Sequence, residues 1–223
     1  MLVPQTVHHP WDVTPEEAIA LQQRLAGLVR LEPLSTPPRT VGGVDTAGDP
    51  FGFRLRAAAV VLSFPDLQLL EAARTEVDVP FPYIRGLLTF REAPAILAVL
   101  ELLDSLPDVL LIDGQGLAHP RRMGIASQVG LLLDRPTIGC AKKRLVGTHG
   151  PLADHKGAAV DLVHQGEVVG AVLRSRAGVK PLFISPGHRT DLATAREIAL
   201  ACCPRYRLPE PLRLAHTLAG APA

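Results

Sequence analysis

Short apolar runs separated by turn residues dominate the first third of the chain. Residues 41–45, 53–63 and 67–75 have the length and composition of strands, and only short polar segments lie between them. Strands joined by such short turns pair in an antiparallel manner. The pattern therefore predicts a three-stranded antiparallel meander.

Four other segments have apolar residues at helical spacing: 14–30, 91–106, 121–133 and 190–202. The first begins with Thr14, Pro15 and Glu17, a combination of cap, proline and acid that is typical of a helix start. In the second segment we expect Pro94 to lie in the first turn, where a proline is tolerated.

Further short strands are predicted between and after these helices: 108–112, 137–141, 158–163, 167–174 and 181–184. This order predicts an α/β fold, a mixed sheet in which parallel strands follow the meander, flanked by helices. We expect a single domain over residues 1–223. Its N-terminal helix covers about residues 14–30 and its core about residues 41–212.

Composition adds a large core and a near-balance of charge. Hydrophobic residues make up 47% of the 223 residues, and 23 Lys and Arg face 22 Asp and Glu. No apolar run is long enough to span a bilayer, and residues 1–5 do not begin a signal peptide, so we expect a cytoplasmic monomer without membrane contact. The three cysteines lack the spacing of a disulfide framework or a zinc site, which favours buried thiols.

Asp113 follows four apolar residues at the end of a predicted buried strand. A buried carboxylate without a partner is costly or becomes protonated, so Asp113 is either a turn residue or a ligand for a positive group. Asp45 ends the first strand in the same way, and Glu92 lies near a helix start, where it could simply favour the helix dipole. Taken singly, each of the three acids has such a structural explanation.

Together the three acids predict a metal site if strands 41–45 and 108–112 are neighbours. Asp45 and Asp113 would then lie close together and would repel each other unless a cation held them. Carboxylate oxygens select Mg²⁺ or Mn²⁺, and such sites catalyse in-line displacement at phosphodiesters. His188, just before the last predicted helix, could join this metal site or transfer a proton. Lys142, just after a strand, could contact the scissile phosphate, although a solvated basic turn is the commoner case.

Motifs along most of the chain resemble the endonuclease V family, repair nucleases that act beside deoxyinosine. In chain order they are Gly43-Val44-Asp45, Pro82-Tyr83-Ile84 with Gly86, Phe90-Arg91-Glu92, Ile112-Asp113-Gly114 with Gly116, His119-Pro120-Arg121, Ala141-Lys142, Leu145 with Gly147, and Gly187-His188-Arg189. The resemblance runs from about residue 41 to 211. It implies an RNase H-like fold and a Mg²⁺-dependent cut at the second phosphodiester 3′ to the lesion, which leaves 3′-hydroxyl and 5′-phosphate ends.

The resemblance also implies roles for individual residues. The metal-binding carboxylates would be Asp45, Glu92 and Asp113. The other catalytic residues would be His188 and Lys142, with Lys143 as the less favoured alternative to Lys142. The strand-separating wedge would include Tyr83, Ile84, Arg85 and Gly86, and an aromatic ring there can fill the gap left by an extruded base. Further contacts to the substrate would come from Gly114, Gly116, Gly139, His119 and Arg121, the glycines by letting backbone approach the base.

One residue departs from the family pattern. Where the family's wedge usually has a second proline, this chain has Arg85. The loop loses a fixed backbone angle and gains a charge, so we expect normal chemistry with an altered lesion preference.

Three alternatives remain at this point. A ribonuclease specific for inosine or another RNase H-like nuclease would use the same acids. A module that binds inosine without cutting would not need them, and neither would a plain interaction domain.

Overall fold

The computed structural model describes residues 7–49 and 52–221, so residues 1–5, named above for their lack of a signal peptide, lie outside it. An eight-stranded sheet in the order β3-β2-β1-β4-β5-β8-β7-β6 forms its centre. The strands are β1 Thr40–Ala47, β2 Arg54–Ser63, β3 Leu69–Asp78, β4 Val109–Ile112, β5 Thr137–Ala141, β6 Ala159–His164, β7 Glu167–Leu173 and β8 Leu182–Pro186. The helices are α1 Pro15–Ala26, α2 Leu88–Leu100, α3 Ile125–Leu133, α4 Leu192–Ala201 and α5 Glu210–Gly220.

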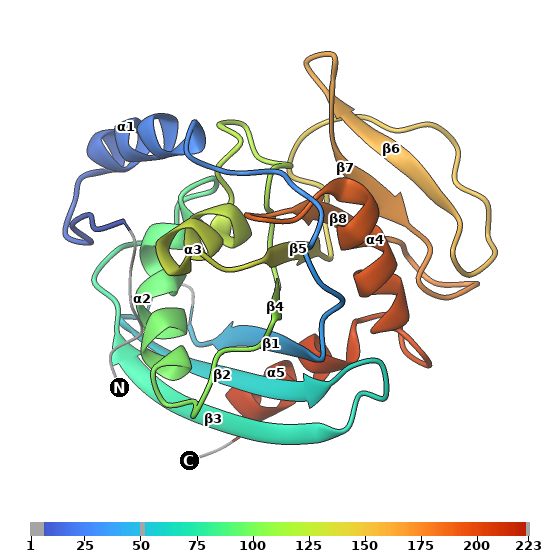
Figure 1. Cartoon of the computed structure of the whole chain (residues 1–223). Coiled ribbons are helices and arrows are strands. Elements are labelled where there is room, and N and C mark those ends of the chain that lie inside the picture. Colours follow the sequence, from blue (N-terminus) through green and yellow to red (C-terminus); the bar gives the residue numbers. More distant parts are fainter. Residues whose placement is uncertain (1–6, 50–51, 222–223) are drawn as a thin grey trace.

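The predicted mixed α/β sheet is confirmed, including its antiparallel meander. Strands β1, β2 and β3 pair antiparallel, whereas β4 pairs in parallel with β1 and with β5. The helices α2 and α3 make the crossovers between them, and β6 and β7 form the expected hairpin, which projects from the body (Figure 1). Strand β8, which matches the strand predicted at 181–184, joins this hairpin to β5.

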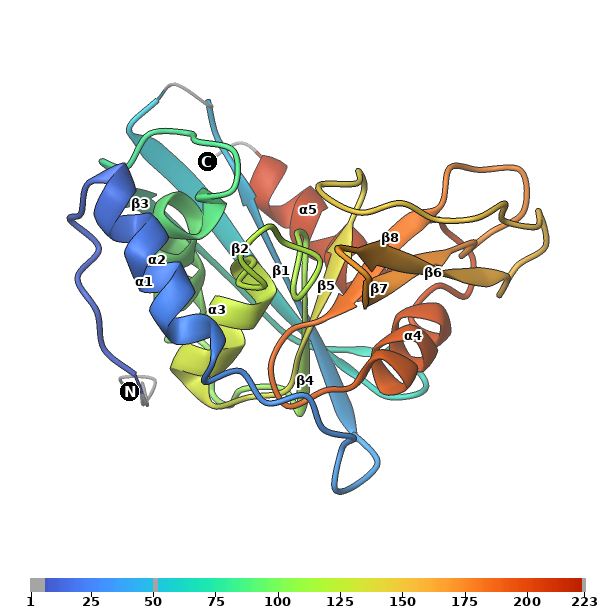
Figure 2. The same cartoon turned by 90° about the horizontal axis from the view of Figure 1, so that it is seen from above.

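Alternating side chains of the central strands bury both faces of the sheet. In β4, Leu110 and Ile112 pack with α2 and α3, whereas Val109 and Leu111 pack in the cluster that contains α4. Figure 2 shows α1 outside α2 and α3, and α4 on the opposite side of the sheet. Such two-sided burial explains why these strands read as continuous apolar runs.

Three helix predictions need correction. Helix α2 starts at Leu88, three residues earlier than expected, because buried residues already precede Arg91. It ends at Leu100, six residues earlier than expected. Pro94 therefore lies inside the helix, where it removes the donor that would bond the Phe90 carbonyl. Helix α3 starts at Ile125 rather than at residue 121.

The third correction concerns α5, which the sequence reading missed. It packs mainly on β1 and β2, and Gly43 of β1 makes this possible, because a Cβ there would lie 2.3 Å from the Pro211 carbonyl carbon. The missed signal is the helical spacing of the buried Leu212, Ala215 and Ala219.

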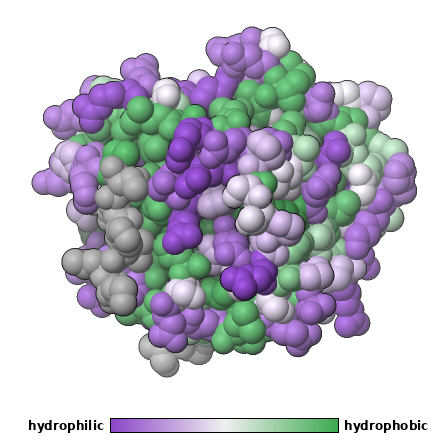
Figure 3. Space-filling view, in the orientation of Figure 1, coloured by the Kyte–Doolittle hydropathy of each residue, from purple (hydrophilic) through white to green (hydrophobic). Residues whose placement is uncertain are grey.

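The surface is mixed in polarity. On the face shown in Figure 3, hydrophilic residues gather toward the middle with hydrophobic residues on either side. Cys140, Cys202 and Cys203 are buried free thiols, as predicted. Among the described residues, no helix combines the length and apolar character needed to cross a membrane.

Candidate active site

Two of the predicted carboxylates leave the sheet side by side. In the parallel pair of β1 and β4, Val44 is the partner of Ile112, so Asp45 and Asp113 follow adjacent positions at the same edge. Their side chains are 11% and 20% exposed. The neighbouring strands on which the metal hypothesis depended are therefore confirmed.

Glu92 of α2 lies close enough to this pair for the charges of Asp45 and Asp113 to act on its carboxyl group. Burial raises the pKa of Glu92 to about 8, and the negative charges of Asp45 and Asp113 add to the effect, against a hydrogen bond from Thr46. The pKa of Asp45 is also raised, first by burial and then by Asp113. Three mutually repelling carboxylates in one partly buried cluster favour a bound cation.

Two positive or protonatable groups contact the cluster. The Lys142 ammonium, just beyond β5, forms an ion pair with Asp113. The His216 imidazole on α5 lies with its Nδ1 2.5 Å from Asp45 Oδ2. His216 belongs to the helix that the sequence reading missed, and it is the site residue that the reading failed to find.

The donor set suits a hard divalent cation. Carboxylate oxygens with one imidazole are ligands that Mg²⁺ and Mn²⁺ accept. Within residues 7–49 and 52–221, no group of three or more acidic, histidine or cysteine side chains is arranged to hold a metal ion. Asp113 contacts Lys142, and Asp45 contacts His216.

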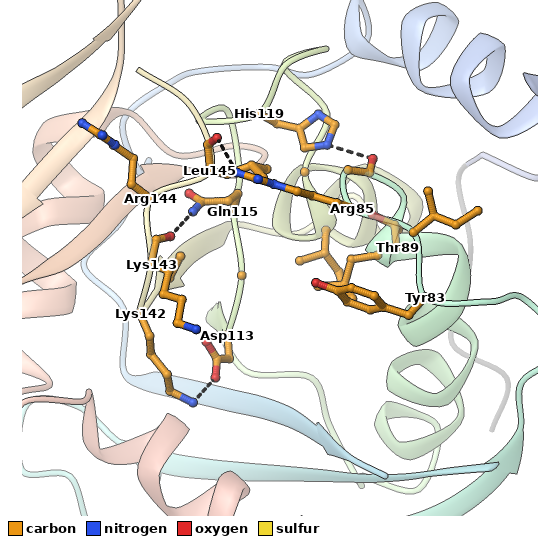
Figure 4. Close-up of a pocket in the computed structure, with 17 residues that line it drawn as sticks. Tyr83, Arg85, Thr89, Asp113, Gln115, His119, Lys142, Lys143, Arg144 and Leu145 are labelled. Atoms are coloured by element: carbon orange, nitrogen blue, oxygen red, sulfur yellow. Dashed lines mark hydrogen bonds and ion pairs between the residues drawn. The ribbon is translucent and has the colours of Figure 1, made fainter. Parts of the chain in front are cut away.

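A cavity of about 560 Å³ opens beside Asp113 and Lys142 (Figure 4). This volume lies within the range of roughly 300–1,000 Å³ typical of small-molecule sites. Residues 83–86 form one wall and belong to the loop of residues 82–86, which we call the wedge loop. The opposite wall is the segment of residues 141–145. Further lining residues are Leu88, Thr89, Gly114, Gln115, His119, Gly124 and Ile125.

The wedge loop reaches across the mouth of the cavity. The Arg85 guanidinium Nη2 donates to the Leu145 carbonyl at 3.3 Å, and Figure 4 shows the side chain extended between the two walls. Tyr83 is 57% exposed on the same loop. The structure thus places Tyr83, Ile84, Arg85 and Gly86 together at the cavity, next to the acidic cluster.

Comparison with known proteins agrees with this arrangement. The model of the family described as endonuclease V matches residues 23–217. The chain belongs to the endonuclease V family.

Relatives and solved structures of the family align over nearly the whole chain. An endonuclease V of Nostoc punctiforme is 52% identical, and the alignment covers 96% of this chain and 97% of that protein. The crystal structure of endonuclease V from Streptomyces avermitilis has a TM-score of 0.89 at 42% identity, covering 96% of this chain and 94% of that one. A structure of Ciona intestinalis endonuclease V, in complex with a 24mer DNA containing an inosine followed by a ribo-adenosine, has a TM-score of 0.79 at 28% identity and covers 92% and 95% of the two chains.

In this member of the endonuclease V family, His188 lies away from the cluster. It follows β8, which runs antiparallel to β5, and its amide donates to Thr137 at the start of β5. Asp113 lies beyond the opposite ends of these strands. The predicted catalytic role of His188 therefore fails on its position, because the direction of β8 reverses the edge at which the residue emerges.

Two of the three predicted base-contacting glycines also lie elsewhere. A Cβ on Gly116 would lie 2.1 Å from the Pro186 oxygen, and one on Gly139 would lie 2.4 Å from the Gly116 nitrogen. Both positions therefore allow segments inside the protein to pack together. Gly114 lines the cavity, and its contact with an extruded base stays a prediction.

Arg121, which was predicted to contact the substrate, and the adjacent Arg122 are both engaged within the protein. Arg121 donates to the Gln22 side chain and to the Gly86 carbonyl, and Arg122 donates to Glu167 and His164 of the hairpin. Amides at the actual start of α3 donate to the carbonyls of Gln115 and Gly116.

Proposed function

We propose that this protein is a DNA repair endonuclease that recognises deoxyinosine and hydrolyses the second phosphodiester bond 3′ to it, leaving 3′-hydroxyl and 5′-phosphate ends. One observation carries the proposal: Asp113, which belongs to the acidic cluster with Asp45 and Glu92, lines a cavity of about 560 Å³ that is also lined by the wedge loop. The Ciona intestinalis relative, bound to inosine-containing DNA, supports the choice of substrate.

The acidic cluster would hold Mg²⁺, or Mn²⁺ in its place. When bound, the ion supplies a nucleophilic water and neutralises charge on the departing oxygen. Lys142 would then contact the scissile phosphate in place of Asp113, as a point charge. The His216 ring would hold a proton at Nδ1 beside Asp45, so that it stabilises the carboxylate nearest to α5.

The wedge loop would separate the lesion from its strand. Tyr83 presents an aromatic ring to solvent, and stacking on such a ring is worth about 1–3 kcal/mol per base. Extruding a base costs a few kcal/mol and is least costly for a poorly paired one, which describes hypoxanthine opposite thymine. The extruded base would enter the cavity between the wedge loop and residues 141–145.

The test is a nicking assay on matched oligonucleotides. Duplex DNA with a single deoxyinosine, the same duplex with deoxyadenosine, and RNA with a single inosine are each incubated with Mg²⁺, Mn²⁺ or EDTA. We expect metal-dependent nicking of the deoxyinosine strand, with product ends mapped to the second 3′ bond.

The possible outcomes separate the alternatives. Preferential cutting of the RNA would make the protein an inosine-specific ribonuclease. Lesion binding without cutting in any metal would make it a binding module. Cutting of all duplexes alike would identify a nuclease without lesion specificity.

A further inference from the structure

A buried chain of hydrogen bonds connects the N-terminal helix with the wedge loop. Gln22 of α1 is fully buried, and its Oε1 accepts a hydrogen bond from Arg121 Nε at 2.6 Å. Its Nε2 donates to the Met123 carbonyl at 3.0 Å. Arg121 Nη2 in turn donates to the Gly86 carbonyl at 2.7 Å. Gln22 lies just before residue 23, where the match to the family model begins.

Gly86 is the point at which this chain reaches the wedge loop. Its φ of +83° suits glycine, and a Cβ there would lie 3.2 Å from Arg121 Nη2. His119 Nε2 also lies 3.0 Å from the Gly86 carbonyl. Two donors therefore converge on a single oxygen and fix the direction in which the loop leaves Gly86.

The hydrogen-bond partners of His119 determine which of its ring nitrogens donates to the Gly86 carbonyl. The Arg121 amide donates to His119 Nδ1, which leaves the hydrogen on Nε2 to donate to Gly86. Burial, together with the charge of Arg121, lowers the pKa of His119 to about 4, in keeping with a neutral ring. Among the described residues, the Arg121 side chain bonds to neutral acceptors on Gln22 and Gly86, so its position depends on both.

The other end of the wedge loop is held in the same way. The buried Arg91 donates through Nη1 to the carbonyl of Phe81, the residue before the loop, at 2.9 Å. The tip between the two anchors, with Tyr83 and Arg85, is exposed and lines the cavity. Buried anchors at both ends thus preset an exposed tip, an arrangement that lowers the entropy lost when the tip engages a ligand.

We infer that Gln22 is a positioning residue for lesion recognition. Acting through Arg121 and Gly86, it holds the wedge loop in the orientation that admits a base to the cavity. The inference rests on the proposed function, and it assigns to α1 a part in recognition. Gln22 is fully buried and reaches the wedge loop through Arg121, so its substitution should act on binding and leave the chemical step in place.

The test compares Gln22→Leu and Gln22→Glu with Gln23→Leu, a matched control at the neighbouring exposed glutamine. Glutamate keeps the acceptor for Arg121 and loses the donor to Met123. Binding to the deoxyinosine duplex is measured in EDTA, with 2-aminopurine beside the lesion to report unstacking, and KM and kcat are measured with Mg²⁺. Circular dichroism confirms that each variant is folded.

We expect Gln22→Leu to raise Kd and KM about five- to tenfold, the effect of about one lost buried hydrogen bond, with kcat unchanged within about twofold. Gln22→Glu should restore most of the binding and the 2-aminopurine signal, and Gln23→Leu should match the wild type. Arg121→Lys should weaken binding alone. Combining it with Gln22→Leu should add little, because the two residues act through one contact.

Several results would overturn the inference. Each of these applies when the wild type prefers deoxyinosine. The first is that Gln22→Leu leaves both binding and the 2-aminopurine signal unchanged, and the second is that it changes kcat alone. The third is that the losses of binding in Gln22→Leu and Arg121→Lys add fully in the double variant. If Gln22→Leu does not fold, Gln22→Glu and Arg121→Lys still decide, since the inference requires the first to bind normally and the second to bind weakly. A wild type without any preference for deoxyinosine would instead overturn the proposed function, and the inference with it.

Discussion

The two ends of strand β4 carry one aspartate each, and the two are treated in opposite ways. Asp108, just before the strand, accepts hydrogen bonds from the amides of Arg39 and Thr40 at 2.8 and 3.0 Å. Burial opposes these bonds, but they prevail and lower the pKa of Asp108. Asp113, just after the strand, shares its edge with two further carboxylates.

The same contrast extends across both edges of the sheet. At the edge of Asp108, Asp134 accepts from Arg30 at 2.5 Å, Arg189 at 3.1 Å and His188 at 3.2 Å, and its pKa is lowered although burial acts the other way. At the other edge, burial raises the pKa of Glu92, and the charges of Asp45 and Asp113 raise it further. Both edges combine acids, a histidine and cations, so residue type alone does not distinguish a structural cluster from a reactive one. The two kinds of cluster differ in how many hydrogen-bond donors and cations are available for each carboxylate.

The largest effect should come from exchanging Asp for Asn at the two ends of β4. Asp113→Asn should reduce nicking of the deoxyinosine duplex by at least about a hundredfold, because a metal ligand is lost, and should leave lesion binding in EDTA largely intact. Asp108→Asn should retain wild-type activity and lose about 1 kcal/mol of unfolding free energy in urea. Equal loss of binding and cutting in Asp113→Asn would point to a structural role for that residue.

The histidines of the two edges give the next largest contrast. His216→Ala should lower kcat/KM about ten- to hundredfold, with unfolding free energy changed by less than about 0.5 kcal/mol, because the ring is exposed and contacts Asp45. His188→Ala should keep kcat/KM and lose about 2–3 kcal/mol, because a buried ring that bonds Arg30 and Asp134 is removed. The reverse pattern would restore His188 to the active site.

These two histidines also show how far the sequence could go. Asp45 and Asp113 were found because strand-like runs ended on them, whereas Glu92 was found near a predicted helix start. The metal hypothesis needed β1 and β4 to be neighbours, and the structure pairs them in parallel. His188 was misplaced because a motif specifies neighbours along the chain but not the direction of the strand before it. Strand β8 pairs antiparallel with both β5 and β7. No local sequence pattern encodes this direction.

The role of the arginines could not be predicted for a related reason. Arg121 and Arg122 form part of a basic run that suits phosphate equally well. Their actual partners, Gln22 and Glu167, lie 99 and 45 residues away along the chain. Only the packing of α1 and of the hairpin against this loop decides that the guanidinium groups bond inside the protein.

The acidic edge should also make the metal-free protein sensitive to pH. The pKa of Glu92 is raised in the folded state to about 8, so its protonated form stabilises the fold at low pH and this contribution is lost as pH rises through 8. Between pH 6.5 and 8 in EDTA, unfolding free energy should fall by about 2 kcal/mol more in the wild type than in Glu92→Gln. Urea unfolding measures both.

Two controls sharpen this measurement. Buried histidines such as His119 and His188, whose pKa values are lowered by burial, affect stability in the opposite sense below pH 6.5, and the difference between the two proteins removes them. Adding Mg²⁺ should flatten the wild-type curve, because a bound cation favours the carboxylate form. Parallel curves for wild type and Glu92→Gln in EDTA would show that the three carboxylates do not repel one another.

The smallest effect should come from the wedge loop, where the acidic edge meets the substrate. Arg85→Pro removes the contact with the Leu145 carbonyl and fixes a backbone angle. Because the contact is exposed and long, we expect kcat on deoxyinosine to stay constant and the ratio of kcat/KM for deoxyinosine to that for deoxyuridine to change about two- to fivefold. Arg85→Gln, which keeps a donor without the charge, separates loss of charge from loss of mobility. An unchanged substrate profile in both variants would show that Arg85 has no part in selecting the base, and that the position of the loop depends on its buried anchors alone.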